Sequence, residues 1–179
     1  LNAKEEDIKD ILEAFSAAKY DFKKISGGMN LIQNLIIQEN SNLKEEQVAN
    51  GIKVIDLLVA KGVDPKAKLK DENETPMLTA AFKQLRPMQP AKDAKPAKDP
   101  KAAAAQAYYG MGGLEMTKYL VTKHKLGVND VDKNKATPLI SLLANKGIDD
   151  ALKLDIVKFL MENGAITSAK SKSGETPMK

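Results

Sequence analysis

The stretches NETPMLTAAF (residues 73–82) and KATPLISLLA (residues 135–144) decide how this chain folds. In each, a short polar turn leads into Thr-Pro and then into a run of apolar residues. A Thr hydroxyl can accept a hydrogen bond from the first free N–H groups of a helix, and Pro at the first helical position lacks an N–H that would stay unpaired. The two stretches therefore predict two helices that begin in the same way.

A third copy of the signal, SGETPMK, occupies residues 173–179. It leaves no room for a helix after Thr176 and Pro177. We expect it to be the start of a further unit or the last turn of an arm. The sequence begins with Leu1 rather than Met, so we also expect a processed or trimmed chain.

A second signature ends the helices. VIDLLVAKGVDPKA (residues 54–67) and IVKFLMENGAITSA (residues 156–169) place apolar residues at helical spacing before Gly62 and Gly164. Both glycines fit the left-handed residue that commonly follows a helix. MTKYLVTKHKLGVNDVD (residues 116–132) is a looser copy in which Gly127 takes this place. The repeating unit is turn, helix, loop, helix, Gly and extended arm.

This order of signals resembles the ankyrin repeat, on the match of Thr75-Pro76-Met77 and Thr137-Pro138-Leu139 to the Thr-Pro-Leu of that family. The resemblance implies an all-α solenoid of helix-loop-helix units with short β-hairpin arms, in four to five repeats that include degenerate caps. Leu78 and Ile140 stand where the family usually has His, so apolar packing is expected in place of that hydrogen bond. The alternative is an ordinary helical bundle with two chance Thr-Pro turns.

We expect a single domain, since 179 residues suffice for one core. Residues 27–37 fit the first-helix position, with Asn30 in place of Thr. Residues 5–22 align Ile8, Ile11, Leu12, Phe15 and Ala18 on one stripe, which indicates a capping helix or the second helix of a worn repeat. The expected divisions are a capping segment 1–27, repeats 28–72, 73–134 and 135–173, and a truncated repeat start 174–179.

The third repeat is roughly thirty residues longer than the family unit. The excess includes a Pro-, Ala- and Lys-rich insertion at 86–105, which holds most of the net charge of +4. Two interpretations are open: a surface loop without a task, or an arm that reaches an acidic partner. Because the rest is close to neutral and aromatic residues make up 4% of the chain, a nucleic-acid binder is not expected.

The residues for catalysis or metal binding are scarce. Cys is absent and His124 is the only His, so a catalytic triad or a His/Cys metal cluster is not expected. Gly110–Gly113 lacks the spacing of a phosphate loop. Glu45 and Asp149 fit helix starts, with Ser41 or Asn42 as cap before Glu45. We therefore expect no enzyme activity, no cofactor and no bound metal, and His124 to be a surface residue.

The resemblance also implies a partner-binding surface on the arms and on the exposed side of the first helices. An exposed Phe82 or Ile37 would anchor a partner, whereas the competing interpretation buries both. The positions carried over are Met29, Ile37, Gln38, Asp71, Glu72, Glu74, Phe82, Lys83, Lys133, Asn134, Lys135, Ala144 and Asn145.

Repeat stacks present long surfaces that bind other proteins. We expect an interaction module that binds and inhibits or sequesters a partner, as bacterial ankyrin immunity proteins do, such as a cap on a peptidoglycan endopeptidase. The alternative is a secreted bacterial effector that binds a host protein. A periplasmic or secreted location is favoured over the cytoplasm because Cys is absent, and a monomer without a membrane span or nucleic-acid partner is expected.

Overall fold

The computed structural model describes residues 5–38, 43–87 and 108–177. Within these ranges the chain is mostly helical, as predicted, with one small sheet that was not. No helix in them is long and apolar enough to cross a membrane. The elements are α1 (Glu5–Ala17), α2 (Leu31–Gln38), α3 (Glu45–Ala60), α4 (Met77–Gln84), β1 (Arg86–Pro87), β2 (Tyr108–Tyr109), α6 (Met111–His124), α7 (Pro138–Ala144) and α8 (Asp150–Glu162).

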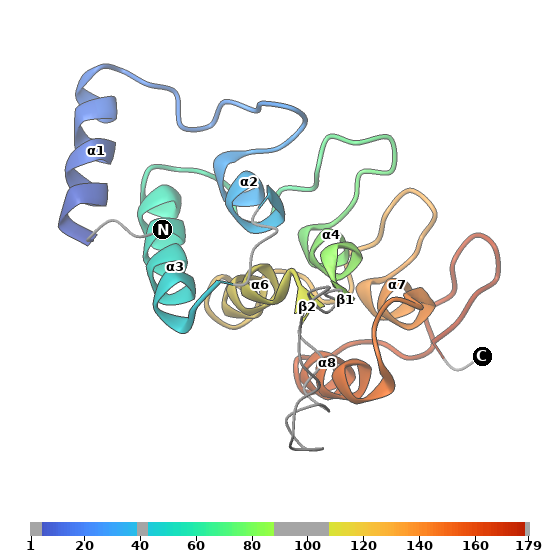
Figure 1. The fold of residues 1–179 in the computed structure, drawn as a ribbon. Coiled ribbons are helices and arrows are strands. Elements are labelled where there is room, and N and C mark those ends of the chain that lie inside the picture. The colour runs from blue at the N-terminus through green and yellow to red at the C-terminus, as the bar shows by residue number, and fades with distance from the viewer. Residues whose placement is uncertain (1–4, 39–42, 88–107, 178–179) are drawn as a thin grey trace, which may run out of the picture.

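The helices are arranged from α1 at one end of the molecule to α7 and α8 at the other (Figure 1). The short helices α2, α4 and α7 contact one another in that sequence, and the longer helices α3 and α6 pack together beside them. Helix α6 also contacts α2 and α4, while α1 packs on α3 and α8 on α7. Two helices thus lie in each of the ranges 28–72, 73–134 and 135–173.

One continuous core runs between the two rows of helices. Each helix contributes apolar residues from the face that meets its neighbours. Ile32, Ile55, Leu120 and Leu142 are completely buried, and each comes from a different helix. Burying one such side chain stabilises a fold by roughly 1.5–3 kcal/mol, so these contacts hold the stack together.

The two Thr-Pro pairs begin their helices differently. The Thr137 hydroxyl accepts a hydrogen bond from the Ile140 N–H, and Pro138 is the first residue of α7, as predicted. The prediction was wrong for Thr75, whose hydroxyl bonds to the Asp71 carboxylate instead. Helix α4 therefore begins at Met77, the residue after Pro76, whereas α7 begins at Pro138 itself.

The Asn30 substitution for Thr works as a cap. Its side-chain oxygen accepts the Gln33 N–H, and the Gln33 side chain accepts the Asn30 N–H, so the two close a reciprocal capping box at α2. In α3, Glu45 is the first helical residue, as its predicted place at a helix start requires. Gln47 reaches back to the Lys44 N–H, because the helix starts at Glu45 itself. The expected caps Ser41 and Asn42 lie outside the described residues.

The helix ends follow the glycine signal in two of three places. Gly62 and Gly164 are both left-handed, with φ of 85°. Gly127 is not. Helix α6 ends earlier, and Lys125 takes the left-handed conformation with φ of 57°. The two extra residues before Gly127 therefore move the end of the helix away from the glycine.

The N-terminal helix is shorter and less covered than its stripe predicted. Helix α1 ends at Ala17, and Lys19 turns the chain with φ of 58°. Phe22 then folds back into the core. Ile11 and Phe15 stay about half exposed, because α1 packs mainly on α3 among the described helices.

The described ends of the insertion are joined by the small sheet. Arg86 and Pro87 pair antiparallel with Tyr109 and Tyr108, respectively. Tyr108 is buried. Residues 88–107, which carry most of the insertion, lie outside the described residues.

Candidate protein-binding surface

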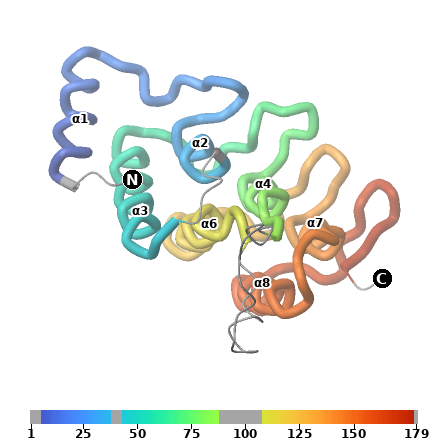
Figure 2. The backbone as a smooth tube through the Cα atoms, in the orientation of Figure 1, coloured from blue at the N-terminus to red at the C-terminus, as the bar shows by residue number. Residues whose placement is uncertain are grey.

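Connections before α2, α4 and α7, and the one after α8, project from the same side of the helices (Figure 2). We call the residues 26–29, 69–75, 132–136 and 171–175 the four arms. Backbone hydrogen bonds of 2.7–2.9 Å join each arm to the one before it. They run from Lys70 N–H to Gly28 C=O, from Lys133 N–H to Asn73 C=O, and from Lys172 N–H to Asn134 C=O.

Within the second and third arms an Asp carboxylate holds the turn. Asp71 accepts the N–H and the hydroxyl of Thr75, and Asp132 accepts the N–H groups of Asn134 and Ala136. Burial raises the pKa of Asp71, but the Thr75 hydrogen bonds outweigh it and bring the pKa below the usual range. Asp71 was predicted to contact a partner, but in the structure its carboxylate stabilises its own turn.

The other predicted arm residues lie on the surface. Glu72, Asn134 and Lys135 are exposed, and the Lys133 ammonium lies 3.4 Å from the Glu74 carboxylate. An exposed pair of this kind contributes about 0–1 kcal/mol, so it does little to hold the arms. These side chains are therefore available to a partner.

The predicted contact residues on the first helices differ in how far they are exposed. Phe82 is 1% exposed and belongs to the core, as the competing interpretation held, so it cannot anchor a partner. Ile37 packs partly against the core, and Met29 is half buried. The Gln38 side chain lies outside the described part. Of this group, Lys83 is exposed.

Asn145 connects α4 to the loop that follows α7. Its amide donates to the carbonyls of Phe82 and Leu85, and its side-chain oxygen accepts the Gly147 N–H. A groove of about 380 Å³ opens beside it, lined by Lys83, Asp132, Ser141, Ala144 and Asn145. Asn145 is thus a fixed part of the groove. It was predicted from the sequence as an exposed contact residue, without the groove or its hydrogen bonds.

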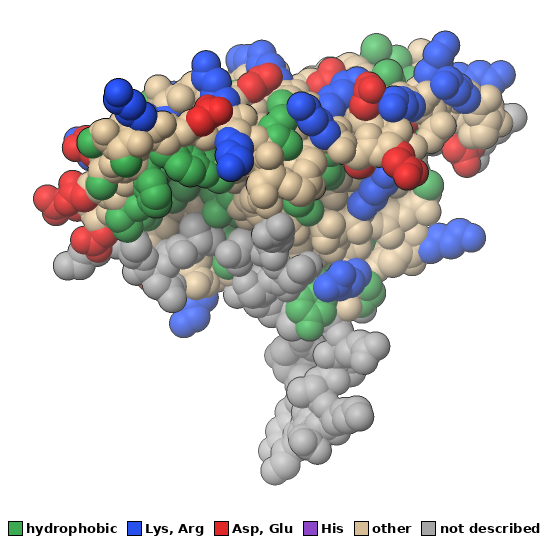
Figure 3. Space-filling model, turned by 90° about the horizontal axis from the view of Figure 1, so that it is seen from above, with side chains coloured by type: hydrophobic (Ala, Val, Ile, Leu, Met, Phe, Trp, Pro, Cys, Tyr) green, Lys and Arg blue, Asp and Glu red, His purple; other side chains and the backbone are tan. Residues whose placement is uncertain are grey.

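Figure 3 shows the molecule from the arm side. Basic side chains are spread along the length of this face, with acidic ones between them. Apolar side chains gather toward one end, where α1 and α3 lie. The arm face therefore offers mixed charge over most of its length.

Sequence reasoning missed a link at the base of the insertion. The Tyr108 hydroxyl donates to the Asp149 carboxylate at 2.7 Å and accepts the Asp149 N–H. Asp149 also caps α8 by accepting the Leu152 N–H, which together with the Tyr108 hydroxyl lowers the pKa of Asp149. Burial is the main reason that the pKa of Tyr108 is raised. The helix-start role of Asp149 was predicted, but its Tyr partner lies 41 residues away in sequence.

A second missed cluster joins α3 to α6 on the side away from the arms. The Tyr119 hydroxyl donates to Asp56 at 2.6 Å, and His124 Nε2 lies 2.8 Å from the other oxygen of Asp56. Burial, reinforced by Asp56, raises the pKa of Tyr119 to about 12. Burial raises the pKa of Asp56, but the hydrogen bonds from Tyr119 and His124 outweigh it and lower that pKa overall. His124 is therefore half buried and paired, rather than a plain surface residue.

The two clusters hold neighbouring elements together through hydrogen bonds. No group of three or more His, Asp or Glu side chains among the described residues is arranged to hold a metal ion. The carboxylates of Asp56 and Asp149 each accept hydrogen bonds from a neighbouring helix or strand. The arm face, by contrast, carries exposed polar side chains that the fold does not use.

Comparison with known proteins does not identify a family for this chain. No family model matches this chain. A stretch of 141 residues is similar, at 23% identity, to alpha-latrocrustotoxin-Lt1a of Latrodectus tredecimguttatus. The match covers 79% of this chain and 7% of the toxin, so the chain spans a small part of that protein. This identity is too low to assign the chain to a family.

Proposed function

We propose that the chain is a stack of ankyrin-type repeats that binds another protein through its arm face and blocks it. The backbone ladder between the four arms supports this most directly. Because it uses main-chain groups, it fixes the spacing of the arms while leaving their side chains free. Such a row of regularly spaced, exposed side chains suits recognition of an extended surface.

The exposed residues of the arms carry this proposal. Glu72 in the second arm, and Asn134 and Lys135 in the third, are exposed to solvent. The proposed activity requires no bond to be made or broken, so the proposal includes no enzyme activity and no cofactor.

The specific form that we propose is self-protection. The chain would cap a bacterial enzyme, such as a peptidoglycan endopeptidase in the periplasm, as the resemblance to ankyrin immunity proteins implies. The alternative, a secreted effector that binds a host protein, uses the same face and differs in its partner.

A pull-down with two variant baits tests the surface. The purified chain, an arm variant (Glu72→Arg with Asn134→Arg) and a control variant on α8 (Lys158→Glu with Glu162→Arg) are used as baits in a lysate of the source cells. We expect the control to retain the partner and the arm variant to lose it. Equal retention by both variants would show that binding does not use the arm face.

An activity assay tests the blocking. The captured partner is purified, and its hydrolase activity is measured on peptidoglycan while the chain is added in increasing amounts. We expect the activity to fall in proportion to the bound fraction. A partner that keeps full activity when saturated with the chain would exclude inhibition, and a host protein as the partner would favour the effector.

A further inference from the structure

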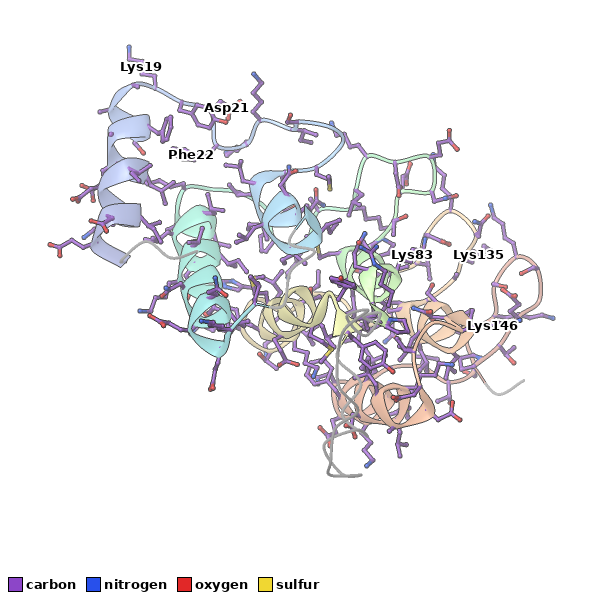
Figure 4. All side chains as sticks on the ribbon, viewed as in Figure 1. Lys19, Asp21, Phe22, Lys83, Lys135 and Lys146 are labelled. Carbon is purple, nitrogen blue, oxygen red and sulfur yellow. The ribbon has the colours of Figure 1, made fainter. Side chains whose placement is uncertain are left out.

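Three lysines lie on three segments that border the groove between α4 and α7. Lys83 lines the groove from the last turn of α4. Lys135 lies in the turn that supplies Asp132, and Lys146 follows Asn145 in the loop after α7. Figure 4 labels the three side chains around this helix pair. The groove volume of about 380 Å³ falls within the range of about 300–1,000 Å³ that binding sites usually have.

These lysines are not explained by the fold. All three are exposed, and in the described part of the chain none forms an ion pair within 4.0 Å, unlike Lys118 and Lys133. Lys135 is also left-handed, with φ of 59°. That conformation is uncommon for residues other than Gly, Asn and Asp. The three lysines therefore lie on segments that border the groove, without an ion-pair partner in the described part that would account for them.

The acidic groups near the groove are already engaged. Asp132 lines it, but one of its carboxylate oxygens accepts two backbone N–H groups of its own turn. Asp71, whose pKa Lys83 helps to lower, accepts the Thr75 N–H and hydroxyl. These hydrogen bonds fix both carboxylates within their own turns, whereas the three lysines are exposed and form no ion pair within 4.0 Å in the described part.

We propose that this groove receives an acidic segment of the partner protein, with Lys83, Lys135 and Lys146 contacting successive Asp or Glu carboxylates. The inference rests on the proposed protein-binding function and adds the chemistry of the partner. An acidic peptide fits better than nucleic acid, because the described aromatic side chains do not line this groove and offer no stacking platform for bases.

Peptide binding tests the inference directly. The probe is a short fluorescein-labelled peptide of alternating Glu and Ser, with a Gln and Ser peptide as the neutral control. Fluorescence anisotropy compares the unaltered chain with a groove triple variant (Lys83→Glu, Lys135→Glu, Lys146→Glu). A control triple (Lys9→Glu, Lys123→Glu, Lys158→Glu) changes the net charge equally at positions outside the groove.

We expect the groove triple to weaken binding of the Glu peptide about tenfold or more, and the control triple roughly twofold or less. A triple of Lys→Arg at the groove should keep most of the binding. Raising the salt from 50 mM to 500 mM should also weaken it, because exposed charges are screened. Circular dichroism checks that each variant folds, and Lys→Gln at the three positions replaces the groove triple if it does not.

Equal weakening by the two triples, equal binding of the Gln peptide, or tighter binding of a single-stranded oligonucleotide would overturn the inference. The pull-down separates this failure from that of the proposed function. If the groove triple retains a partner that the arm variant loses, the arm face binds protein and the acidic-segment inference fails alone. If neither the arm variant nor the groove triple changes capture, the proposed function fails.

Discussion

The arm side and the opposite side of the stack are held in different ways. On the arm side, the same backbone hydrogen bond recurs from Lys70, Lys133 and Lys172 to the preceding arm. On the opposite side, α3 and α6 are joined by the side chains of Tyr119, Asp56 and His124, a cluster that no other described helix pair repeats.

The two sides should therefore respond differently to substitution of their side chains. A main-chain ladder tolerates almost any side chain, so the arms can vary their surface without loss of shape. A side-chain cluster tolerates little change, because each member satisfies another. We therefore expect the arm surface to be permissive for stability and the α3–α6 face to be sensitive, and five substitutions or conditions test this.

The shared core should be the most sensitive site of all. Leu120→Ala in α6 removes a fully buried side chain and should lower the free energy of unfolding by about 2–5 kcal/mol. Leu154→Ala in α8, which is about half exposed, is the matched control and should cost less than about 1 kcal/mol. Urea unfolding followed by circular dichroism measures both. Similar losses would mean that α6 is not the packing centre of the stack.

The turn carboxylate is the exception on the arm side. Asp132→Ala leaves the N–H groups of Asn134 and Ala136 without their acceptor and should cost about 1–3 kcal/mol. Asp130→Ala, two residues earlier, serves as the control. If both cost the same in urea unfolding, the Asp132 carboxylate does not hold the turn.

On the opposite side, Tyr119→Phe removes one hydroxyl and keeps the ring. The loss of its hydrogen bond to Asp56 should cost about 0.5–1.5 kcal/mol. Tyr109→Phe is the comparison, since no hydrogen bond of its hydroxyl is seen in the described part. A Tyr119→Phe protein as stable as the original would remove the argument that this face depends on its cluster.

Acidification should weaken both sides. The pKa values of Asp71 and Asp56 are lowered on folding, so each carboxylate contributes stability that is complete above its unfolded pKa of about 3.9. That contribution is lost as the pH falls through the lower folded pKa. Urea midpoints at pH 7 and pH 3 should differ less in the double variant Asp56→Asn with Asp71→Asn than in the original chain. An unchanged difference would assign the acid sensitivity to other groups.

The smallest effect is expected at the arm surface. Lys133→Ala removes the contact with Glu74 but keeps the backbone hydrogen bond to Asn73, so the cost should be about 0.5 kcal/mol or less. Thermal unfolding in low and high salt measures it. A loss comparable to that of Asp132→Ala would mean that the arm side chains, and not the ladder, hold the arms together.

Local signals in the sequence determined where most helices begin and end. Thr137-Pro138, Asn30 and Asp149 open helices, and Gly62 and Gly164 close them, because each acts on backbone groups within four residues. The polar arms before α4 and α7 were also visible, as was the shortage of residues for catalysis. The mostly helical class followed from these signals and from helical spacing.

Tertiary structure decided what those signals could not. Thr75 matches Thr137 in sequence, yet it turns to Asp71, because the length of its arm places that carboxylate within reach. Phe82 is buried because α2, α6 and α7 pack on α4, and Asn145 borders the Lys83 groove while it binds the carbonyls of Phe82 and Leu85 about sixty residues back in the chain. The pairings of Tyr108 with Asp149, and of Asp56 with Tyr119 and His124, span similar separations. No pattern within one helix or turn carries information on contacts that form only when distant segments pack.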